Sequence, residues 1–417
     1  MTKEKGIPQI RFSGFTDTWE QRKLSDMVER VTRKNENRES ELPLTISAQY
    51  GLIDQNEFFD KRIASRDVSG YYLLKKGEFA YNKSTSSDAP WGAVKRLDRY
   101  EMGVLSTLYI VFALKENGNI DSNFLVSYYD TDCWHKGVQA IAAEGARNHG
   151  LLNITPADYF ETVLTVPSDV KEQHQIGSFF AKLDTLITLH QRKYDKLTKV
   201  KKAMLEKMFP KNGSLYPEIR FKGFTDAWEQ RELSEVTASF EYGLNAAAKE
   251  YDGKHKYIRI TDIDDESREF STEDITSPDT DFSLSDNYIL RKGDILFART
   301  GASVGKTYLY REKDGLIYFA GFLIRAKIKS KYDDVFVFQN TLTDNYNKYI
   351  RITSQRSGQP GVNAQEYGEY TFLLPKYEEQ LRIGEWFTHL DRLITLHQRK
   401  LEKLKNIKKA CLEKMFV

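Results

Sequence analysis

The 417-residue sequence has little cysteine, no long apolar run and no excess of charge of either sign. Its two cysteines, Cys133 and Cys411, lie far apart and exclude a disulfide framework, which predicts a reducing compartment. The longest apolar run, residues 315–324, ends at Arg325 and is about half as long as a membrane span requires. The first residues contain no apolar signal segment. We therefore expect a cytoplasmic protein.

The charges balance almost exactly in number. Lys and Arg total 62 and Asp and Glu total 60, which gives a formal net charge of +2. This balance excludes a uniformly basic nucleic-acid coat and an acidic solvating tail. Apolar residues make up 40% and aromatic residues 13% of the chain, which is typical of globular domains. At roughly 150 residues per domain, the length predicts two or three domains.

Signatures of catalytic and metal sites are scarce as well. The chain has no consecutive Pro-Pro and so lacks the Asn/Asp-Pro-Pro-aromatic motif of amino methyltransferases, and it has no His-Glu-x-x-His zinc helix. Residues 301–307 resemble a nucleotide-binding loop but place three residues between the glycines, where that loop has four. Cys133 and His135 have no third potential ligand nearby in the sequence. We expect no catalytic residues and no metal site.

The sequence contains two copies of one framework. Residues 10–25 (IRFSGFTDTWEQRKLS) and 219–234 (IRFKGFTDAWEQRELS) are identical at 13 of 16 positions. Residues 184–209 and 391–416, which share LITLHQRK, are identical at 19 of 26 positions. The order is a short element, a variable stretch and a long helical segment, followed by the same three parts again.

The two variable stretches, about 26–170 and 235–377, share little beyond a turn motif. Residues 74–78 (LKKGE) and 290–294 (LRKGD) each contain Lys-Gly followed by an acidic residue, and a basic and a hydroxyl residue follow five positions later. This pattern predicts a turn that leads into a strand. The pairs at the expected strand ends are Lys83-Ser84 and Arg299-Thr300.

Short β-branched and aromatic runs at 257–261 and 334–338 predict strands, which indicates mixed α/β globules. A polar, glycine-containing loop lies near the end of each globule, at 145–150 and 356–361. We therefore expect an α+β protein with two mixed α/β globules, two long coiled-coil-like helices and an internal pseudo-two-fold repeat.

Residues 172–208 and the equivalent segment of the second copy lack proline and repeat apolar residues every seven positions. This spacing predicts a helix that buries a narrow seam, in a rod of roughly 55 Å. Lys201 and Lys408 interrupt the seam at the same place in both copies. The expected seam residues are Ile176, Phe180, Leu183, Ile187, His190, Leu197 and Met204, with Ile383, Phe387, Leu390, Ile394, His397, Leu404 and Cys411.

The natural partner of each long helix is the other copy. The linker 210–217 spans at most ~28 Å and is too short to return along the rod, which favours antiparallel helices with the globules at opposite ends. The alternative is that residues 219–234 are fully extended and make the return. For His190 and His397, a buried polar pin that fixes helix register is a better interpretation than metal binding or catalysis.

The second half of each long helix is basic. Between His190 and Met208 there are seven Lys or Arg residues and two acidic residues. Two interpretations remain open: a solvated helix face, and a contact with a partner protein or a nucleic-acid backbone.

The doubled short element, the doubled LITLHQRK helix and the two Lys-Gly-acidic motifs, in this order, resemble the specificity (S) subunit of Type I restriction–modification enzymes. The resemblance implies that each globule is a target recognition domain and that antiparallel helices set the spacing of a bipartite, asymmetric site in double-stranded DNA. It further implies a non-catalytic chain that binds two modification (methyltransferase) subunits and, in a complete enzyme, two restriction subunits. S-adenosylmethionine, ATP and Mg²⁺ would then belong to the partner subunits, with no cofactor in this chain.

With this organisation, the expected segments are the first element and recognition domain, the central spacer helix, the second element and recognition domain, and the C-terminal spacer helix. Their expected bounds are 1–170, 171–212, 213–377 and 378–417.

Base reading requires side chains such as Arg for guanine and Asn or Gln for adenine, together with phosphate contacts that fix the register. We expect these residues in the polar loops, although each also suits an ordinary surface role. The candidates are Gln49, Tyr50, Lys83, Ser84, Thr85, Arg147, Asn148 and His149 in the first globule, and Arg259, Thr261, Arg299, Thr300, Ser303, Lys306, Arg356, Gln359 and Asn363 in the second. An alternative function is a helical adaptor whose globules bind proteins.

Overall fold

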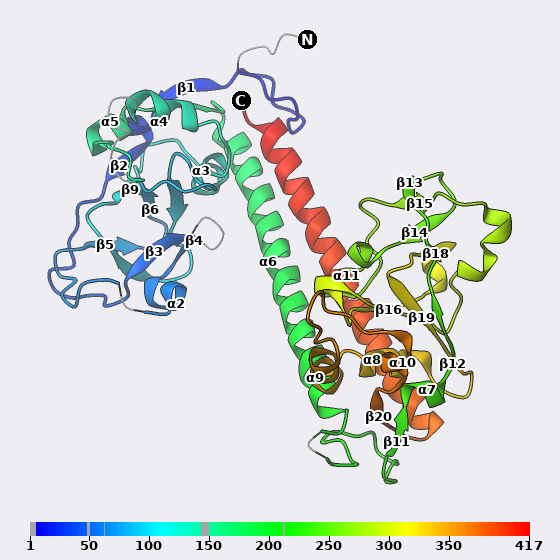
Figure 1. Cartoon of the computed structure of the whole chain (residues 1–417). Helices are drawn as coiled ribbons and strands as arrows, with labels where there is room; N and C mark the ends of the chain where they lie inside the picture. The colour runs from blue at the N-terminus through cyan, green and yellow to red at the C-terminus, as the bar shows by residue number, and fades with distance from the viewer. Residues whose placement is uncertain (1–5, 48–50, 62, 143–149, 212) are drawn as a thin grey trace. The chain divides into compact units, whose positions relative to one another are not determined.

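The computed structural model describes residues 6–47, 51–61, 63–142, 150–211 and 213–417 (Figure 1). It forms two compact units: the first comprises residues 1–189 with 401–417, and the second comprises 190–400. Each unit contains one globule and a part of both long helices, α6 (Val170–Lys207) and α11 (Tyr377–Met415). No helix in the described ranges is long and apolar enough to cross a membrane.

The first unit is built on a four-stranded antiparallel sheet of order β2-β9-β6-β7. Two further strand pairs, β3-β4 and β5-β8, extend this globule, and β1 pairs with β10. Its strands are β1 (Glu20–Lys23), β2 (Val28–Arg30), β3 (Leu44–Ser47), β4 (Gly51–Asp54), β5 (Tyr72–Lys75), β6 (Phe79–Asn82), β7 (Ala93–Arg96), β8 (Met102–Leu105), β9 (Ile110–Leu114) and β10 (Val163–Val166). Its short helices are α1 (Leu24–Met27), α2 (Gln55–Phe59), α3 (Ser122–Tyr129), α4 (His135–Ala142) and α5 (Pro156–Phe160).

The second unit repeats this sheet as β12-β19-β16-β17 and adds a second sheet of order β13-β15-β14-β18. Its strands are β11 (Glu229–Glu232), β12 (Thr237–Tyr242), β13 (Ala248–Glu250), β14 (Lys256–Ile258), β15 (Thr276–Pro278), β16 (Asp294–Ala298), β17 (Thr307–Leu309), β18 (Ile317–Phe319), β19 (Leu323–Ile328) and β20 (Thr371–Leu374). Its α-helices are α7 (Leu233–Val236), α8 (Asp334–Asn340), α9 (Asp344–Thr353) and α10 (Ala364–Gly368). Its 3₁₀ helices are η1 (Ile260–Asp262), η2 (Phe282–Leu284), η3 (Asp286–Tyr288), η4 (Gly301–Ser303) and η5 (Glu312–Asp314).

The repeated short element closes each unit in the same way. Its tryptophan packs edge-on against a phenylalanine at the end of a long helix: Trp19 against Phe416 at 6.0 Å, and Trp228 against Phe209 at 6.1 Å. Both tryptophans are buried, so the short element belongs to the core of its unit. The two copies of the short element therefore make the same contact, in which a buried tryptophan packs between the end of a long helix and a globule.

The long helices are paired and antiparallel. In the second unit, His190 lies against His397 while Lys201, further along α6, lies against Asp391, which is earlier in α11. The opposite numbering directions define antiparallel helices and confirm the orientation favoured by the short linker. In the first unit the same helix contact is made by Lys408 and Asp184, whose charged atoms are 2.7 Å apart.

One glycine in each long helix permits close packing on the globule. A Cβ at Gly177 would lie 2.4 Å from the backbone nitrogen of Phe124, and a Cβ at Gly384 would lie 2.3 Å from Oδ1 of Asp333. No side chain larger than hydrogen fits at these distances. Glycine lowers helix propensity at these two positions, but it allows the helix to contact the globule closely.

The predicted turn motif is confirmed in both globules. Gly77 and Gly293 have φ values of +89° and +87°, which glycine adopts without strain. The acidic residue that follows each glycine accepts a hydrogen bond from a backbone nitrogen three residues earlier: Glu78 from Lys75 and Asp294 from Arg291, both at 2.8 Å. The turns lead into β6 and β16, as the sequence predicted.

The strand predicted at 334–338 is wrong, because these residues form helix α8. The run is apolar on consecutive positions, and its residues 336–340 are buried on all sides, so neither a two-residue nor a 3.6-residue period is visible. The deciding signal is Asp333, whose side chain accepts a hydrogen bond from the backbone nitrogen of Phe336 at 2.7 Å and caps the helix. At 257–261 the structure has the end of strand β14 followed by η1.

Candidate nucleic-acid interface

The basic and hydroxyl residues predicted at the strand ends lie directly after β6 and β16. In each globule this strand end is fastened to the chain that enters the last short helix. The carbonyl oxygen of Lys83 accepts a hydrogen bond from Leu152 at 3.0 Å, and that of Arg299 accepts one from Val362 at 2.9 Å. Two globules with little sequence in common thus share the same junction.

A second backbone hydrogen bond lies at the same place in both globules. Thr85 donates to the carbonyl oxygen of Gly150 at 2.6 Å, and Gly301 donates to that of Pro360 at 3.0 Å. In the second globule the strand end and the glycine loop, which the sequence analysis treated as separate candidates, therefore form one surface; in the first, Gly150 is the one residue of the loop 145–150 within the described residues.

In the first globule the described part of this surface is polar and partly engaged. Lys83 donates from Nζ to the carbonyl oxygen of Ile154 at 3.2 Å, and partial burial lowers its pKa. The hydroxyl of Thr85 donates to Gly150 at 3.0 Å, while Ser84 is exposed. The candidates that lie outside the described residues are Gln49, Tyr50, Arg147, Asn148 and His149.

In the second globule the loop 356–361 presents exposed polar side chains. Arg356 and Gln359 are exposed, and Arg356 is oriented by an ion pair with Glu366 and by the carbonyl oxygen of Thr353 at 2.8 Å. The amide nitrogen of Gln359 is 3.1 Å from the place where a Cβ on Gly301 would lie, so the two loops are in contact. Thr300, beside Gly301, is half-buried.

Some candidates make contacts inside the domain. Asn363 caps helix α10 by accepting a hydrogen bond from Glu366 at 2.9 Å. Lys306 is only 8% exposed, donates to the carbonyl oxygen of Ile263 at 3.0 Å and forms an ion pair with Asp265. These roles tie the strand-end loop to neighbouring segments.

Residues 301–305 also match the Gly-x-Ser-x-Gly pattern of a hydrolase nucleophile elbow. That motif requires a strand followed by a sharp turn and an α-helix. Here β16 is followed by the single 3₁₀ turn η4 and then by strand β17, so Ser303 does not have the context of such a nucleophile. In the part of the chain that the structure describes, no group of three or more His, Cys, Asp or Glu side chains is placed to hold a metal ion.

Arg259 and Thr261 lie at the rim of a pocket of about 560 Å³ in the second unit, which Arg299 also lines. The guanidinium of Arg259 forms two hydrogen bonds to Asp262, at 2.9 and 2.8 Å, and this pairing raises its pKa. The ion pair fixes the direction of the guanidinium at the pocket. Three candidates from two separate sequence segments are thus brought together.

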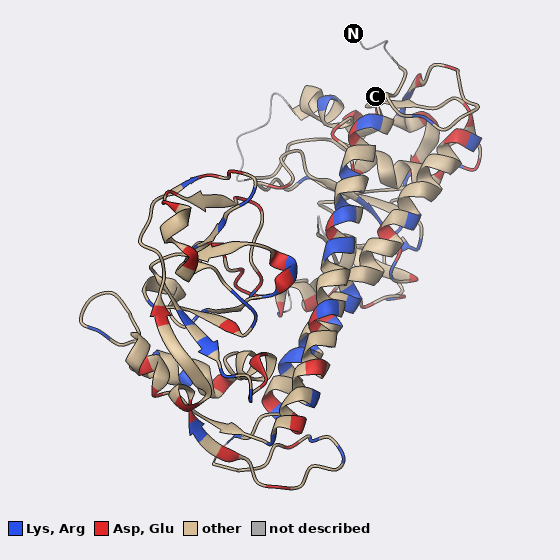
Figure 2. Ribbon diagram, turned by 90° about the vertical axis from the view of Figure 1, so that its right-hand side faces the viewer, with Lys and Arg blue, Asp and Glu red and all other residues tan. Residues whose placement is uncertain are grey.

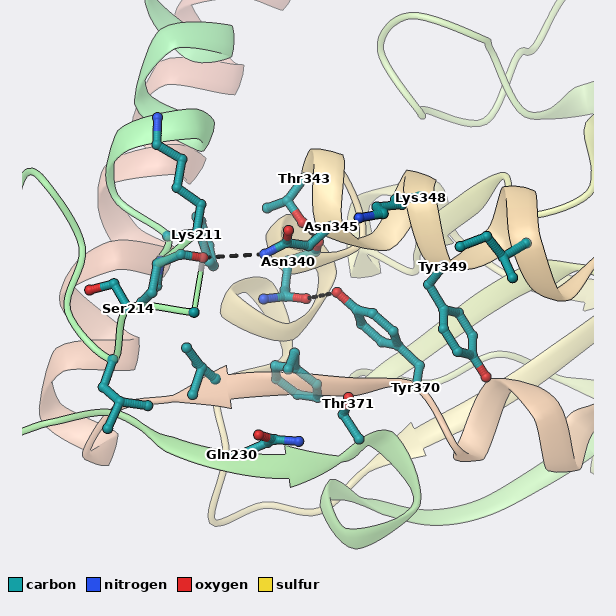
Figure 3. A pocket seen from close by; sticks show the side chains of 17 residues that line it. Lys211, Ser214, Gln230, Asn340, Thr343, Asn345, Lys348, Tyr349, Tyr370 and Thr371 are labelled. Atoms are coloured by element: carbon teal, nitrogen blue, oxygen red, sulfur yellow. Dashed lines mark hydrogen bonds between the residues drawn. The ribbon is translucent and has the colours of Figure 1, made fainter.

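A different cavity of about 390 Å³ lies where the chain leaving α6 crosses helix α9 and strand β20 (Figure 3). Asn345 donates to the carbonyl oxygen of Pro210 at 3.2 Å, and Tyr370 donates to Asn340 at 2.8 Å. The first of these hydrogen bonds joins the linker to the second globule and the second joins two segments of the globule, which gives this cavity a structural explanation.

The sequence analysis missed the role of the lysines that interrupt the helix seam. Lys201 is 2.7 Å from Asp391, and both side chains are only 14% exposed. Lys408 is held by Asp184 and by Asp130 of the first globule, at 2.7 and 2.8 Å, and these two carboxylates raise its pKa against the opposing effect of burial. The signal was present, because the Asp and the Lys occur at the same two positions in both copies.

The remaining basic residues of the helices face solvent. Figure 2 shows Lys and Arg (blue) recurring along both long helices. In the second half of α6 the exposed ones are Arg192, Lys193, Lys196, Lys199, Lys202 and Lys207. Both interpretations of this basic face, a solvated surface and a contact with a partner or a nucleic-acid backbone, are compatible with this exposure.

Together, these features define a duplicated architecture: two unlike α+β globules with equivalent loop junctions, each built onto antiparallel helices. Residues 225–406 match the model of the Type I restriction modification DNA specificity domain. This part of the chain is therefore similar to the specificity domains of Type I restriction–modification systems.

Relatives agree with this assignment. The chain is 26% identical over 216 residues to the putative type I restriction enzyme MjaX specificity subunit of Methanocaldococcus jannaschii, covering 48% of this chain and 49% of that protein. It is 22% identical over 263 residues to the type I restriction enzyme MjaVIII specificity subunit of the same organism, covering 60% of each. The matched region thus spans about half to three fifths of these curated relatives. The fold is similar to that of a Type I restriction–modification S subunit from M. genitalium, with a TM-score of 0.62, 15% identity and 99% of both chains covered.

Proposed function

We propose that this chain is the DNA-reading specificity subunit of a Type I restriction–modification complex, in which each globule reads one half of a bipartite site. The observation that carries the proposal is the junction shared by the two globules. In both, the strand end that carries a basic and a hydroxyl residue is joined by two equivalent backbone hydrogen bonds to the chain that enters the last short helix, at Gly150 and Leu152 in the first globule and at Pro360 and Val362 in the second. Such a combination suits phosphate contacts that fix the register and side chains that read base edges.

The two globules differ around this shared junction, and only the second carries the additional β13-β15-β14-β18 sheet among the described residues. Unlike globules read unlike half-sites, so the proposed target is asymmetric. Major-groove faces recur about every 34–36 Å along duplex DNA, and helices of this length measure roughly 55 Å. In this proposal the paired helices set the spacing between the half-sites.

The proposal also assigns partners. The long helices dock two modification subunits, which bind S-adenosylmethionine and methylate adenine, and two restriction subunits, which use ATP and Mg²⁺, complete the nuclease. The chain itself contributes recognition. The relatives support this arrangement, since both are named as specificity subunits of restriction enzymes.

The experiment is selection of duplexes from a random pool by the full-length chain assembled with its modification subunits. We expect enrichment of two short, different sequences separated by a constant number of base pairs. Affinity for the selected duplex is expected to fall steeply with salt, because bound phosphates release counterions. A complex that enriches no sequence, or whose affinity is insensitive to salt, would contradict DNA reading and favour an adaptor that binds proteins.

A further inference from the structure

The pocket of about 560 Å³ in the second unit has an unusual composition for a protein surface. It opens between the end of β12, the start of β13, η1 and the turn that joins β18 to β19. Two exposed aromatic rings and two arginines line it, namely Tyr242, Phe322, Arg259 and Arg299. Flat apolar faces and guanidinium groups are thus concentrated in a single concave site.

Phe322 is held rigidly although its side chain is 58% exposed. It occupies a tight turn in which Leu323 donates to the carbonyl oxygen of Ala320 at 2.9 Å. The carbonyl oxygen of Phe322 itself accepts a hydrogen bond from the backbone of Arg299 at 3.1 Å. Exposure of a large apolar ring to water is unfavourable. The hydrogen bonds of the turn fix the backbone at Phe322 and keep this residue at the surface. Such a residue is typical of a contact surface for a ligand.

Tyr242, the last residue of β12, provides a second flat surface and is 46% exposed. The guanidinium carbon of Arg299 lies 5.1 Å from the centroid of its ring, which is the geometry of a cation–π contact. Arg299 is therefore fixed against the ring, and its cationic group remains at the pocket. This pair forms a planar, partly cationic platform.

The polar groups of the pocket are directed by their neighbours. The hydroxyl of Tyr257 donates to the carbonyl oxygens of Leu244 and Ala246, at 2.8 and 3.1 Å, so it is engaged within the pocket wall. Arg259 is fixed by Asp262, and Asn245 is exposed at the rim. The pocket therefore offers hydrogen-bonding groups beside flat rings.

We propose that this pocket receives a single nucleobase turned out of the DNA helix, which stacks on Phe322 beside the Tyr242–Arg299 platform. The inference rests on the proposed function and deepens it. Bases inside a duplex present only their edges in the grooves, whereas a ring that offers its face to an aromatic side chain must have left the stack. A planar ring with a polar edge matches aromatic faces next to guanidinium and amide groups. An apolar protein segment fits less well, because it would bury the guanidinium of Arg299 without supplying a hydrogen-bond acceptor.

The test follows the stacking of every base in the selected duplex when the full-length chain binds with its modification subunits. Purine positions are replaced one at a time by 2-aminopurine and cytosines by pyrrolocytosine, whose fluorescence increases when they unstack, and thymines are probed with permanganate. The modification subunits are themselves expected to extrude the adenine that they methylate. We therefore expect one further position within the half-site read by the second globule, distinct from the methylated adenine, to become unstacked on binding.

Substitutions then assign the unstacked base to the pocket. F322A is expected to abolish the unstacking signal at that position and to weaken binding to the selected duplex by about tenfold, the loss typical of one base-stacking contact. F322W, which retains a flat ring, should restore the signal. L284A is the matched control, because Leu284 is 79% exposed in the same unit but does not line the pocket. It should leave the signal and the affinity unchanged.

The outcomes separate the inference from the function on which it rests. If the duplex is still selected and no further base unstacks, the pocket does not receive a base, and DNA reading stands. An unstacking signal that persists in F322A also overturns the inference, because the base then occupies another site. If F322A weakens binding although no further base unstacks in the parent complex, Phe322 instead contacts DNA in the groove, for example at a thymine methyl group, and the inference fails. If no duplex is selected, both the inference and the proposed function fail.

Discussion

Arg220 binds the carboxylate of Glu379 through two hydrogen bonds, from Nε and Nη2, both 2.7 Å long. Glu379 is 1% exposed at the start of the long helix α11, so this pair ties the repeated short element to the helix. Arg11 and Glu172 form the same pair in the first unit, at 2.6 and 2.8 Å. The hydrogen bonds and the charge of Glu379 raise the pKa of Arg220.

We predict that R220L destabilises the second unit by about 3–5 kcal/mol, because the buried carboxylate of Glu379 would lose the charge of Arg220 and two charge-assisted hydrogen bonds. Denaturant unfolding monitored by tryptophan fluorescence measures this loss. The control is K376L, which removes an ion pair with Asp226 in which both side chains are more than 60% exposed. It should have no measurable effect, and equal losses in the two variants would show that the buried pair has no special role.

The contact between His190 and His397 is predicted to make helix pairing sensitive to acid. Their Nδ1 atoms are 2.8 Å apart, a distance that suits a neutral pair in which one nitrogen donates to the other. Burial, together with nearby Lys193 and Lys400, lowers the pKa of both histidines. The unfolded chain, with a pKa near 6.5, binds protons more readily than the folded protein, so the free energy of unfolding should fall as the pH drops below about 6.5.

The double variant H190L/H397L should lack this part of the pH dependence, as measured by thermal unfolding between pH 5 and 8. H389L is the control, because His389 is exposed on the same helix α11. If the double variant keeps the full acid sensitivity of the parent protein, the histidine pair is not its source.

Ionised Asp333 is predicted to lower the free energy of unfolding at neutral pH. It caps α8, and burial raises its pKa to about 6, an effect to which Asp334 and Glu385 add. Because the folded state favours the protonated form, the contribution of this group to stability declines as the pH rises from about 4 to above 6. D333N keeps the capping oxygen without the charge and should be more stable than the parent by about 1–2 kcal/mol at pH 7.

The difference between D333N and the parent protein should become small near pH ~3, where the aspartate is mostly protonated in both the folded and the unfolded states. Urea unfolding at several pH values tests this expectation. A difference that does not change with pH would mean that the substitution acts through packing rather than through the charge.

Arg356, exposed on the glycine loop of the second globule, is predicted to contact DNA. If it reads a base, R356A should weaken binding to the selected duplex by about 1–3 kcal/mol while leaving binding to random duplex unchanged. Equal losses on both duplexes would instead indicate a phosphate contact. Since Arg356 also pairs with Glu366, E366Q serves as the control for disturbance of the loop, and it should retain discrimination between the two duplexes.

The features that could be predicted from the sequence are those encoded by local repetition. The doubled elements, the long helices and the Lys-Gly-acidic turns depend on residues close together in the chain, and Gly77 and Gly293 report backbone conformation directly. Helix orientation followed from the length of one linker. In each case the residues of one short segment were sufficient to predict the structure.

The features that escaped prediction depend on contacts between distant segments. Helix α8 is buried on all sides, so its pattern does not distinguish a helix from a strand. Lys201 and Asp391 are 190 positions apart in the sequence and meet only because the helices pair. The pocket joins the ends of β12 and β16 to the turn before β19, and the exposed Phe322 becomes informative only when its fixed turn and its neighbours are known.

The most direct test of the account is to replace residues 26–170 by the corresponding globule of another specificity protein and to sequence the methylome of cells that carry the hybrid with its modification subunits. The account predicts that one half of the methylated sequence changes, while the other half and the number of base pairs between them stay the same. A change in both halves, or in the spacing alone, would contradict the assignment of one half-site to each globule.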